Sequence, residues 1–187
     1  VAGVIGSGQM RGMADIGGTP HGASRLSDLL QLLGVHRSTD LVRAMELPVP
    51  LRRLHEGDML FHEGTEPEAI YVVRSGTFKT FSTAADGYEQ VMGFAGRSEV
   101  LGFDALGSGA HPTAALALEE SSVYSVLVRD LFTLGQRVPA FEKAMAMAIV
   151  TAKAKAEAEA KAKAKGTAMA TAKAKAVLLA AAAAGHL

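Results

Sequence analysis

Residues that could surround a phosphate are concentrated between Glu99 and Pro112, in the stretch EVLGFDALGSGAHP. The backbone N–H groups of Gly107–Gly109 could cradle an anion, as glycine-rich loops do in nucleotide-binding proteins. However, the stretch contains no lysine or arginine. A buried phosphate without a cationic partner faces a desolvation cost of several kcal/mol. The glycines are therefore better explained as turn residues.

Histidines and carboxylates are the other side chains that could do chemistry. The chain has six histidines and no cysteine, so thiolate metal sites and disulfides are excluded for this sequence. His55 and His62 flank an expected turn and lack the close spacing of a metal pair. Glu119 and Glu120 are neighbours in an expected strand, where adjacent side chains point to opposite faces. We therefore expect no enzyme activity, no metal site and no cofactor.

The elements that position these residues change along the chain. Residues 1–22 are rich in glycine and are expected to be a flexible tail. Helical patterns over 24–34 and 38–47 follow, with Leu41, Met45 and Val42 expected to face inward. From residue 48 onward, roughly eight short strands alternate with turns, which is typical of an antiparallel β-roll or jelly-roll. The predicted fold is mainly β with helices, and residues 23–137 form its β-roll domain.

A helix is expected from Pro139 onward, because proline is favoured at a first helical position. Its apolar residues recur at helical spacing and predict a seam between two copies of the chain. The candidate seam residues are Phe141, Met145, Ala146 and Ile149. Residues 138–187 are therefore expected to contain a dimerisation helix and an Ala/Lys-rich C-terminal segment.

The Ala/Lys-rich segment carries most of the positive charge. Residues 151–187 contain seven lysines and two glutamates, whereas the whole chain has a net charge of zero. Lysine and alanine alternate with a period of two, which on a helix distributes the lysines all round. Three interpretations remain open. The segment could be a basic tail that binds nucleic acid, a continuing helix whose true side chains are not represented here, or a designed or frame-shifted stretch.

Three stretches resemble the sensor domain of the Crp/Fnr superfamily of bacterial transcription regulators, and the Fnr branch more than the cyclic-AMP receptor branch. They are EGDMLFHEGTEPEAIYVVRSGTFKTF, DGYEQVMGF and LGFDALGSGAHPTAALALEESSVYSV, and the resemblance covers about residues 24–150. It implies a cytoplasmic homodimer with a winged helix-turn-helix that binds DNA and with RNA polymerase as a partner. No winged helix-turn-helix is recognisable after residue 150.

The resemblance also implies where a cyclic nucleotide would bind. In this family a Glu contacts the ribose and an Arg neutralises the phosphate, within a G-E-L and R-[ST]-A cassette. The matching segments here are Gly102-Phe103-Asp104 and Pro112-Thr113-Ala114. Phe103 replaces the Glu and Pro112 replaces the Arg. We therefore expect no recognition of cyclic AMP through this cassette, and the small-molecule effector is left undetermined.

Fnr-type regulators hold a [4Fe–4S] cluster through four cysteines. A gapless match places the ligand positions at Gly22, Arg25, Gln31 and Tyr124, none of which can replace a thiolate. The resemblance therefore implies an Fnr-like framework without a cysteine-held cluster.

A polar loop over residues 93–99 matches a region where relatives contact RNA polymerase, and Arg97 and Glu99 are its candidate contact residues. Two other functions stay open from the sequence. One is a cupin-like jelly-roll metalloenzyme, and the other is a β-roll scaffold with a basic nucleic-acid-binding tail. No apolar run approaches the roughly 18 residues that a membrane span requires, so no membrane association is expected.

Overall fold

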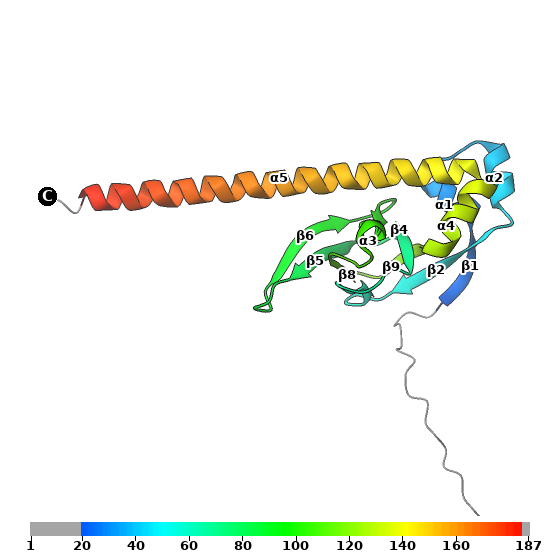
Figure 1. Ribbon diagram of the computed structural model, residues 1–187, viewed down its shortest axis with the longest axis horizontal. Helices are drawn as coiled ribbons and strands as arrows, with labels where there is room; N and C mark the ends of the chain where they lie inside the picture. Colours follow the sequence, from blue (N-terminus) through cyan, green and yellow to red (C-terminus); the bar gives the residue numbers. More distant parts are fainter. Residues whose placement is uncertain (1–19, 185–187) are drawn as a thin grey trace, which may run out of the picture.

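The computed structural model describes residues 20–184, which form two antiparallel sheets that pack as a roll, with helices at one end and a long helix along one side (Figure 1). This confirms the predicted β-roll. The five-stranded sheet has the order β1 (Pro20–Arg25), β2 (Pro48–Leu54), β9 (Ser121–Leu127), β4 (Ala69–Ser75), β7 (Val100–Leu101). The four-stranded sheet has the order β3 (Met59–Phe61), β8 (Ala114–Ala117), β5 (Phe78–Thr83), β6 (Glu89–Ala95).

Burial along the strands follows their place in the sheets. In β4, which pairs with both β9 and β7, the first five side chains are all buried. Strand β6 lies at an edge and pairs with β5 only, and its residues Met92 and Phe94 remain exposed. Met92 and Phe94 therefore lie on a face of β6 that the other sheet does not cover.

The turn between β4 and β5 requires glycine at position 76. Gly76 has a φ of +84°, in the left-handed region that favours glycine. A Cβ at this position would lie 2.8 Å from the Cα of Ser121 and would also collide with the Ser121 side chain. The predicted turn at this position is confirmed, and its glycine is fixed by both conformation and close packing.

Helices α1 (Leu26–Leu32) and α2 (Ser38–Ala44) lie where helices were predicted. The predicted orientation of α2 is right for Leu41, which packs against the core, and wrong for Val42 and Met45, which are 64% and 48% exposed. Ala44 is buried as well, so the helix packs through Leu41 and this small residue, while Val42 and the C-cap residue Met45 lie at the surface.

Four more helical elements complete the fold. They are α3 (Ala105–Ser108), the 3-10 helix η1 (Val128–Asp130), α4 (Leu131–Arg137) and α5 (Pro139–Ala184). Helix α5 begins beside α1, α2 and α4, passes along the roll and extends beyond it (Figure 1). Its 46 residues form one continuous helix, so the Ala/Lys-rich segment is helical as far as residue 184.

The core has two parts. One lies between the two sheets and is centred on residues such as Phe78, Val73 and Val123. The other joins the helical end to the larger sheet and includes Phe141 and Met145 of α5. The first turns of α5 are therefore anchored in the core of their own chain.

Candidate functional site

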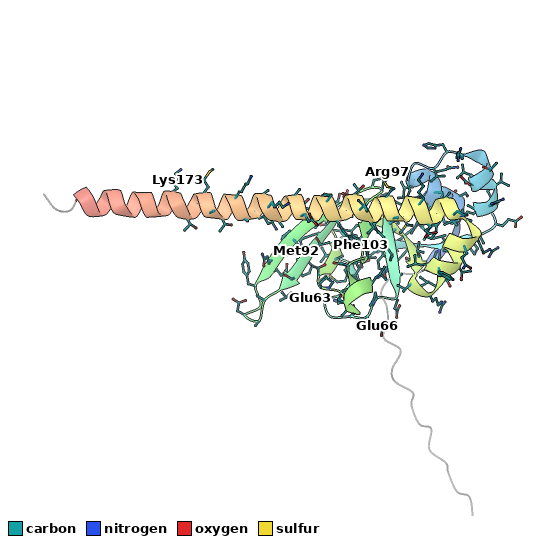
Figure 2. The ribbon with its side chains drawn as sticks, turned by 45° about the horizontal axis from the view of Figure 1, so that its top comes forward. Glu63, Glu66, Met92, Arg97, Phe103 and Lys173 are labelled. Atoms are coloured by element: carbon teal, nitrogen blue, oxygen red, sulfur yellow. The ribbon has the colours of Figure 1, made fainter. Side chains whose placement is uncertain are left out.

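A groove of about 1050 Å³ lies between α5 and the roll, and we call it the α5 groove. The roll contributes parts of β6 and β7 and the residues just after β7, and α5 contributes one face between residues 152 and 171. In Figure 2, Met92 and Phe103 mark the side of the roll that α5 passes over. The same view places Lys173 on the part of α5 that extends beyond the roll.

The α5 wall of the groove consists of two parallel rows of residues four positions apart. Residues at this spacing lie on the same face of a helix. One row consists of small residues, and the other consists of polar residues. The small row is Ala152, Ala156, Ala160, Ala164 and Ala168, and the polar row is Lys155, Glu159, Lys163, Thr167 and Thr171.

Apolar side chains form most of the opposite wall. Phe61 and Leu101 are buried, and Phe103 is half-buried and packs against the core. Further along α5, Met92 and Phe94 line the groove while remaining 43% and 54% exposed. The roll side of the groove is thus mainly apolar, with Gln90, Glu99 and Asp104 among its polar lining residues.

Two lysines connect α5 to the roll. The Lys155 Nζ donates to both carboxylate oxygens of Glu99, at 2.5 and 2.8 Å, and to the Phe94 carbonyl at 2.8 Å. The Lys163 Nζ donates to the carbonyl of Val91. The Lys155–Glu99 pair is 40% and 30% exposed, so water screens it and its contribution to stability is small, about 1 kcal/mol or less. Its structural effect is to hold α5 against the loop between β6 and β7.

The cassette positions lie together at one end of the groove. Gly102, Phe103, Asp104 and Thr113 all line it, whereas Pro112 is exposed and is not among the lining residues. The Asp104 Oδ1 accepts a hydrogen bond of 3.1 Å from the backbone N–H of Ala105, so this carboxylate caps α3. Neither Phe103 nor Pro112 supplies a polar side chain for a ribose or a phosphate.

His111 lies directly behind this end of the groove. Its side chain is only 3% exposed and stacks on Phe61, with ring centroids 4.0 Å apart. Its Nδ1 has no hydrogen-bond partner among the described residues. Burial lowers the pKa of His111 below its ordinary value of 6.5, and the nearby Asp104 offsets this only in part. The imidazole is therefore held in its neutral form.

A lowered pKa of His111 makes stability depend on pH. Above pH 6.5 the imidazole is neutral in both states, so it has no effect. Below that pH the unfolded chain binds a proton that the folded chain does not, so the free energy of unfolding falls as the pH falls. We expect His111→Gln to flatten this decline below pH 6.5 in urea unfolding. His62→Gln, at an exposed position, is the control, and equal slopes for both variants would contradict the assignment.

The candidate dimer-seam residues are divided between the core and the surface. Phe141 and Met145 are 2% and 4% exposed and pack in the core of their own chain. Ile149 is partly buried against the same core, and Ala146 is exposed. Met147 and Val150 are each 61% exposed and lie on the same helix. The apolar surface that α5 leaves exposed therefore includes Met147 and Val150, whereas Phe141 and Met145 are not part of it.

The candidate polymerase-contact residues occupy one loop but differ in their surroundings. Arg97 is exposed, and its Nη1 donates to the carbonyl of Arg74 at 2.9 Å. Glu99 is half-buried, faces Lys155 and also accepts from the backbone N–H of Gly96 at 2.7 Å. Glu99 thus belongs to the contact between the roll and α5, and both residues remain predictions as polymerase contacts.

Sequence reasoning missed the contribution of α5 to the groove. The signal was present in the four-residue spacing of the alanines and of Lys155, Glu159 and Lys163. The alternation with a period of two concealed it, because it places lysines on every face of the helix. Only the position of the roll shows which of these rows is covered.

Metal-binding clusters and membrane-spanning helices are both absent from residues 20–184. Within that range, no group of three or more histidine, cysteine, aspartate or glutamate side chains is arranged to hold a metal ion. No helix in the same range is both long enough and apolar enough to cross a membrane. The four positions matched to cluster ligands lie in β1, α1 and β9, where Tyr124 is buried in the core.

Comparisons with known proteins match this architecture. Residues 51–137 match the family model for the cyclic nucleotide-binding domain. The chain is 35% identical over 113 residues to the fumarate and nitrate reduction regulatory protein of Escherichia coli (strain K12). That match covers 60% of this chain and 44% of the relative, so the chain spans less than half the length of such curated relatives.

Solved structures show the same fold. The N-terminal domain of a transcriptional regulator from Streptomyces coelicolor A3(2) is 25% identical, with a TM-score of 0.51 over 67% of this chain and 88% of that one. The catabolite activator protein of Thermus thermophilus is 24% identical, with a TM-score of 0.52 over 62% of this chain and 55% of that one. In its cyclic nucleotide-binding fold and its Fnr-like sequence, the chain is similar to the transcription regulators of the Crp/Fnr superfamily.

Proposed function

We propose that the chain is the sensor part of a Crp/Fnr-type transcription regulator and that it detects its signal in the α5 groove. The observation that carries this proposal is the double role of α5. The helix forms one wall of the groove and then continues beyond the roll to residue 184. An occupant that fits one placement of α5 better than another would shift the population between those placements.

The activity of the whole regulator is part of the same proposal. The curated relatives are more than twice as long as the segment that this chain matches. We propose that the complete regulator is a cytoplasmic bacterial homodimer that binds DNA and contacts RNA polymerase. The dimer would form along α5, with Ala146 and Ile149 among its contacts, and Arg97 and Glu99 remain the candidate polymerase contacts.

We also propose that the groove does not recognise cyclic AMP in the usual way and that no cysteine-held cluster is involved. Phe103 places an aromatic ring where the family has a ribose-binding carboxylate. Pro112 supplies no positive charge and does not line the groove. The sequence has no cysteine to bind a cluster. These substitutions leave the fold of the sensor intact while removing both of the best-known ligands.

Titration calorimetry with cyclic AMP tests this proposal. We expect no saturable binding at concentrations up to about 1 mM, because Pro112 supplies no positive charge for the phosphate and the groove is lined by three carboxylates and two ammonium groups. A cyclic-AMP-binding regulator titrated in parallel serves as the positive control. Stoichiometric binding with a dissociation constant of about 10 μM or lower would refute the proposed loss of recognition.

A DNA-binding measurement separates a regulator from a basic scaffold. The complete regulator should bind specific promoter DNA, and this chain by itself should bind DNA only weakly. If this chain alone binds DNA with a steep dependence on salt, and if deletion of residues 160–187 abolishes that binding, the basic nucleic-acid-binding alternative is correct instead.

A further inference from the structure

We propose that the α5 groove binds a mainly apolar small molecule that carries no anionic group and that lies lengthwise along α5. This inference names the class of effector, and it rests on the proposed role of the groove as the signal site. It is carried by the shape of the groove, by its apolar walls and by the charges that line it.

The shape of the groove favours an elongated occupant. The alanines from Ala152 to Ala168 span about 24 Å at the rise of an α-helix. A methyl side chain at each of these positions leaves space between the helix and the roll that a larger side chain would fill. The volume of about 1050 Å³ is at the upper end of the range for small-molecule sites.

The walls of the groove favour an apolar occupant. Aromatic and aliphatic side chains line the inner end, where Phe61, Leu101 and Phe103 face the first alanines of the α5 row. Met92 and Phe94 continue this surface along β6. These two side chains remain 43% and 54% exposed, so α5 covers them only in part. An apolar molecule in the groove would remove this surface from water.

The charges disfavour an anion. Three carboxylates (Glu99, Asp104 and Glu159) and two ammonium groups (Lys155 and Lys163) line the groove, which gives a net charge of −1. Both ammonium groups already donate to protein acceptors. An anionic occupant at Lys155 would have to separate it from Glu99 and would leave that carboxylate without its partner. Lys163 donates to a neutral carbonyl and keeps its charge, but Glu159 lies one turn away on the same face of α5. Lys153 lies 6.0 Å from the centre of the Phe103 ring but is exposed and does not line the groove.

Two fluorescent probes that differ by one sulfonate provide the test. N-phenyl-1-naphthylamine is uncharged, and 1-anilinonaphthalene-8-sulfonate has the same rings with one negative charge. We expect the uncharged probe to bind this chain about tenfold more tightly or better, because the sulfonate would lose its hydration in a mainly apolar groove lined by more carboxylates than ammonium groups. Excess cyclic AMP should leave the bound uncharged probe in place.

Two matched variants locate the binding site. Ala156→Phe places a ring inside the groove and should weaken binding of the uncharged probe by about tenfold or more. Ala158→Phe makes the same change on the same helix at an exposed position outside the groove, and it should change binding by less than about twofold. Circular dichroism of both variants checks that α5 remains helical.

Each outcome is decisive. Equal or tighter binding of the sulfonate probe would overturn the inference, and so would equal effects of the two substitutions. Displacement of the uncharged probe by cyclic AMP would overturn both the inference and the proposed loss of nucleotide recognition. Failure of the complete regulator to bind DNA would refute the proposed function and leave the probe measurements standing.

Discussion

Gly76→Ala is expected to lower the free energy of unfolding by about 3 kcal/mol or more, the largest effect of any single methyl group that we predict. Two costs combine at this position. The φ of +84° is unfavourable for any residue with a Cβ, by about 1–2 kcal/mol. The new Cβ would also lie 2.7 Å from the Cβ and 2.8 Å from the Cα of Ser121. Because one of these atoms belongs to the backbone of β9, side-chain rotation cannot relieve the collision.

Gly87→Ala separates the two costs. Gly87 has a nearly identical φ of +82°, but a Cβ there would meet nothing within 4 Å. We expect this control to lose only the conformational part, about 1–2 kcal/mol, in urea unfolding followed by circular dichroism. Equal losses in the two variants would show that the contact between the β4–β5 turn and β9 is not tight.

Phe141→Ala is expected to lower the free energy of unfolding by about 3–5 kcal/mol, the usual range for a buried phenylalanine. Phe141 is 2% exposed and packs in the core that joins α5 to the helical end of the roll. Removing its ring leaves a cavity at the base of α5. The destabilisation should appear in the unfolding of the single chain at any protein concentration, because Phe141 packs against residues of its own chain.

Met147→Ala is the matched control on the same helix. Its side chain is 61% exposed, so the substitution should change single-chain stability by less than about 0.5 kcal/mol. If copies of the chain associate along this exposed face of α5, sedimentation should show weaker association for Met147→Ala. A large stability loss for Met147→Ala together with none for Phe141→Ala would reverse our assignment of the two faces.

Most of the fold could be predicted because its signals are local. Strand residues alternate with turns, glycine marks reversals such as Gly76 and Gly87, and Pro139 opens the last helix. The direction in which a short helix faces was harder to predict. In α2 Ala44 and Leu41 face the core, whereas Val42 and the C-cap residue Met45 point outward, because the space available there is set by distant parts of the chain.

The candidate site could be predicted only on the roll side. Gly102, Phe103, Asp104 and Thr113 were found through their order in the sequence, and the structure brings all four to the groove. The α5 side depends on which face of a uniform helix meets the roll. Neither composition nor periodicity contains that information when alanine and lysine occur on every face.

The single long helix described above has a mechanical consequence. Between its contact at Lys163 and its described end at Ala184, α5 projects for about 30 Å. At that length, a tilt of about 10° at the contact moves the far end by about 5 Å, which is one helical turn. The projecting segment therefore amplifies motion, because the same tilt moves α5 by only about 2 Å at Lys155, eight residues before Lys163.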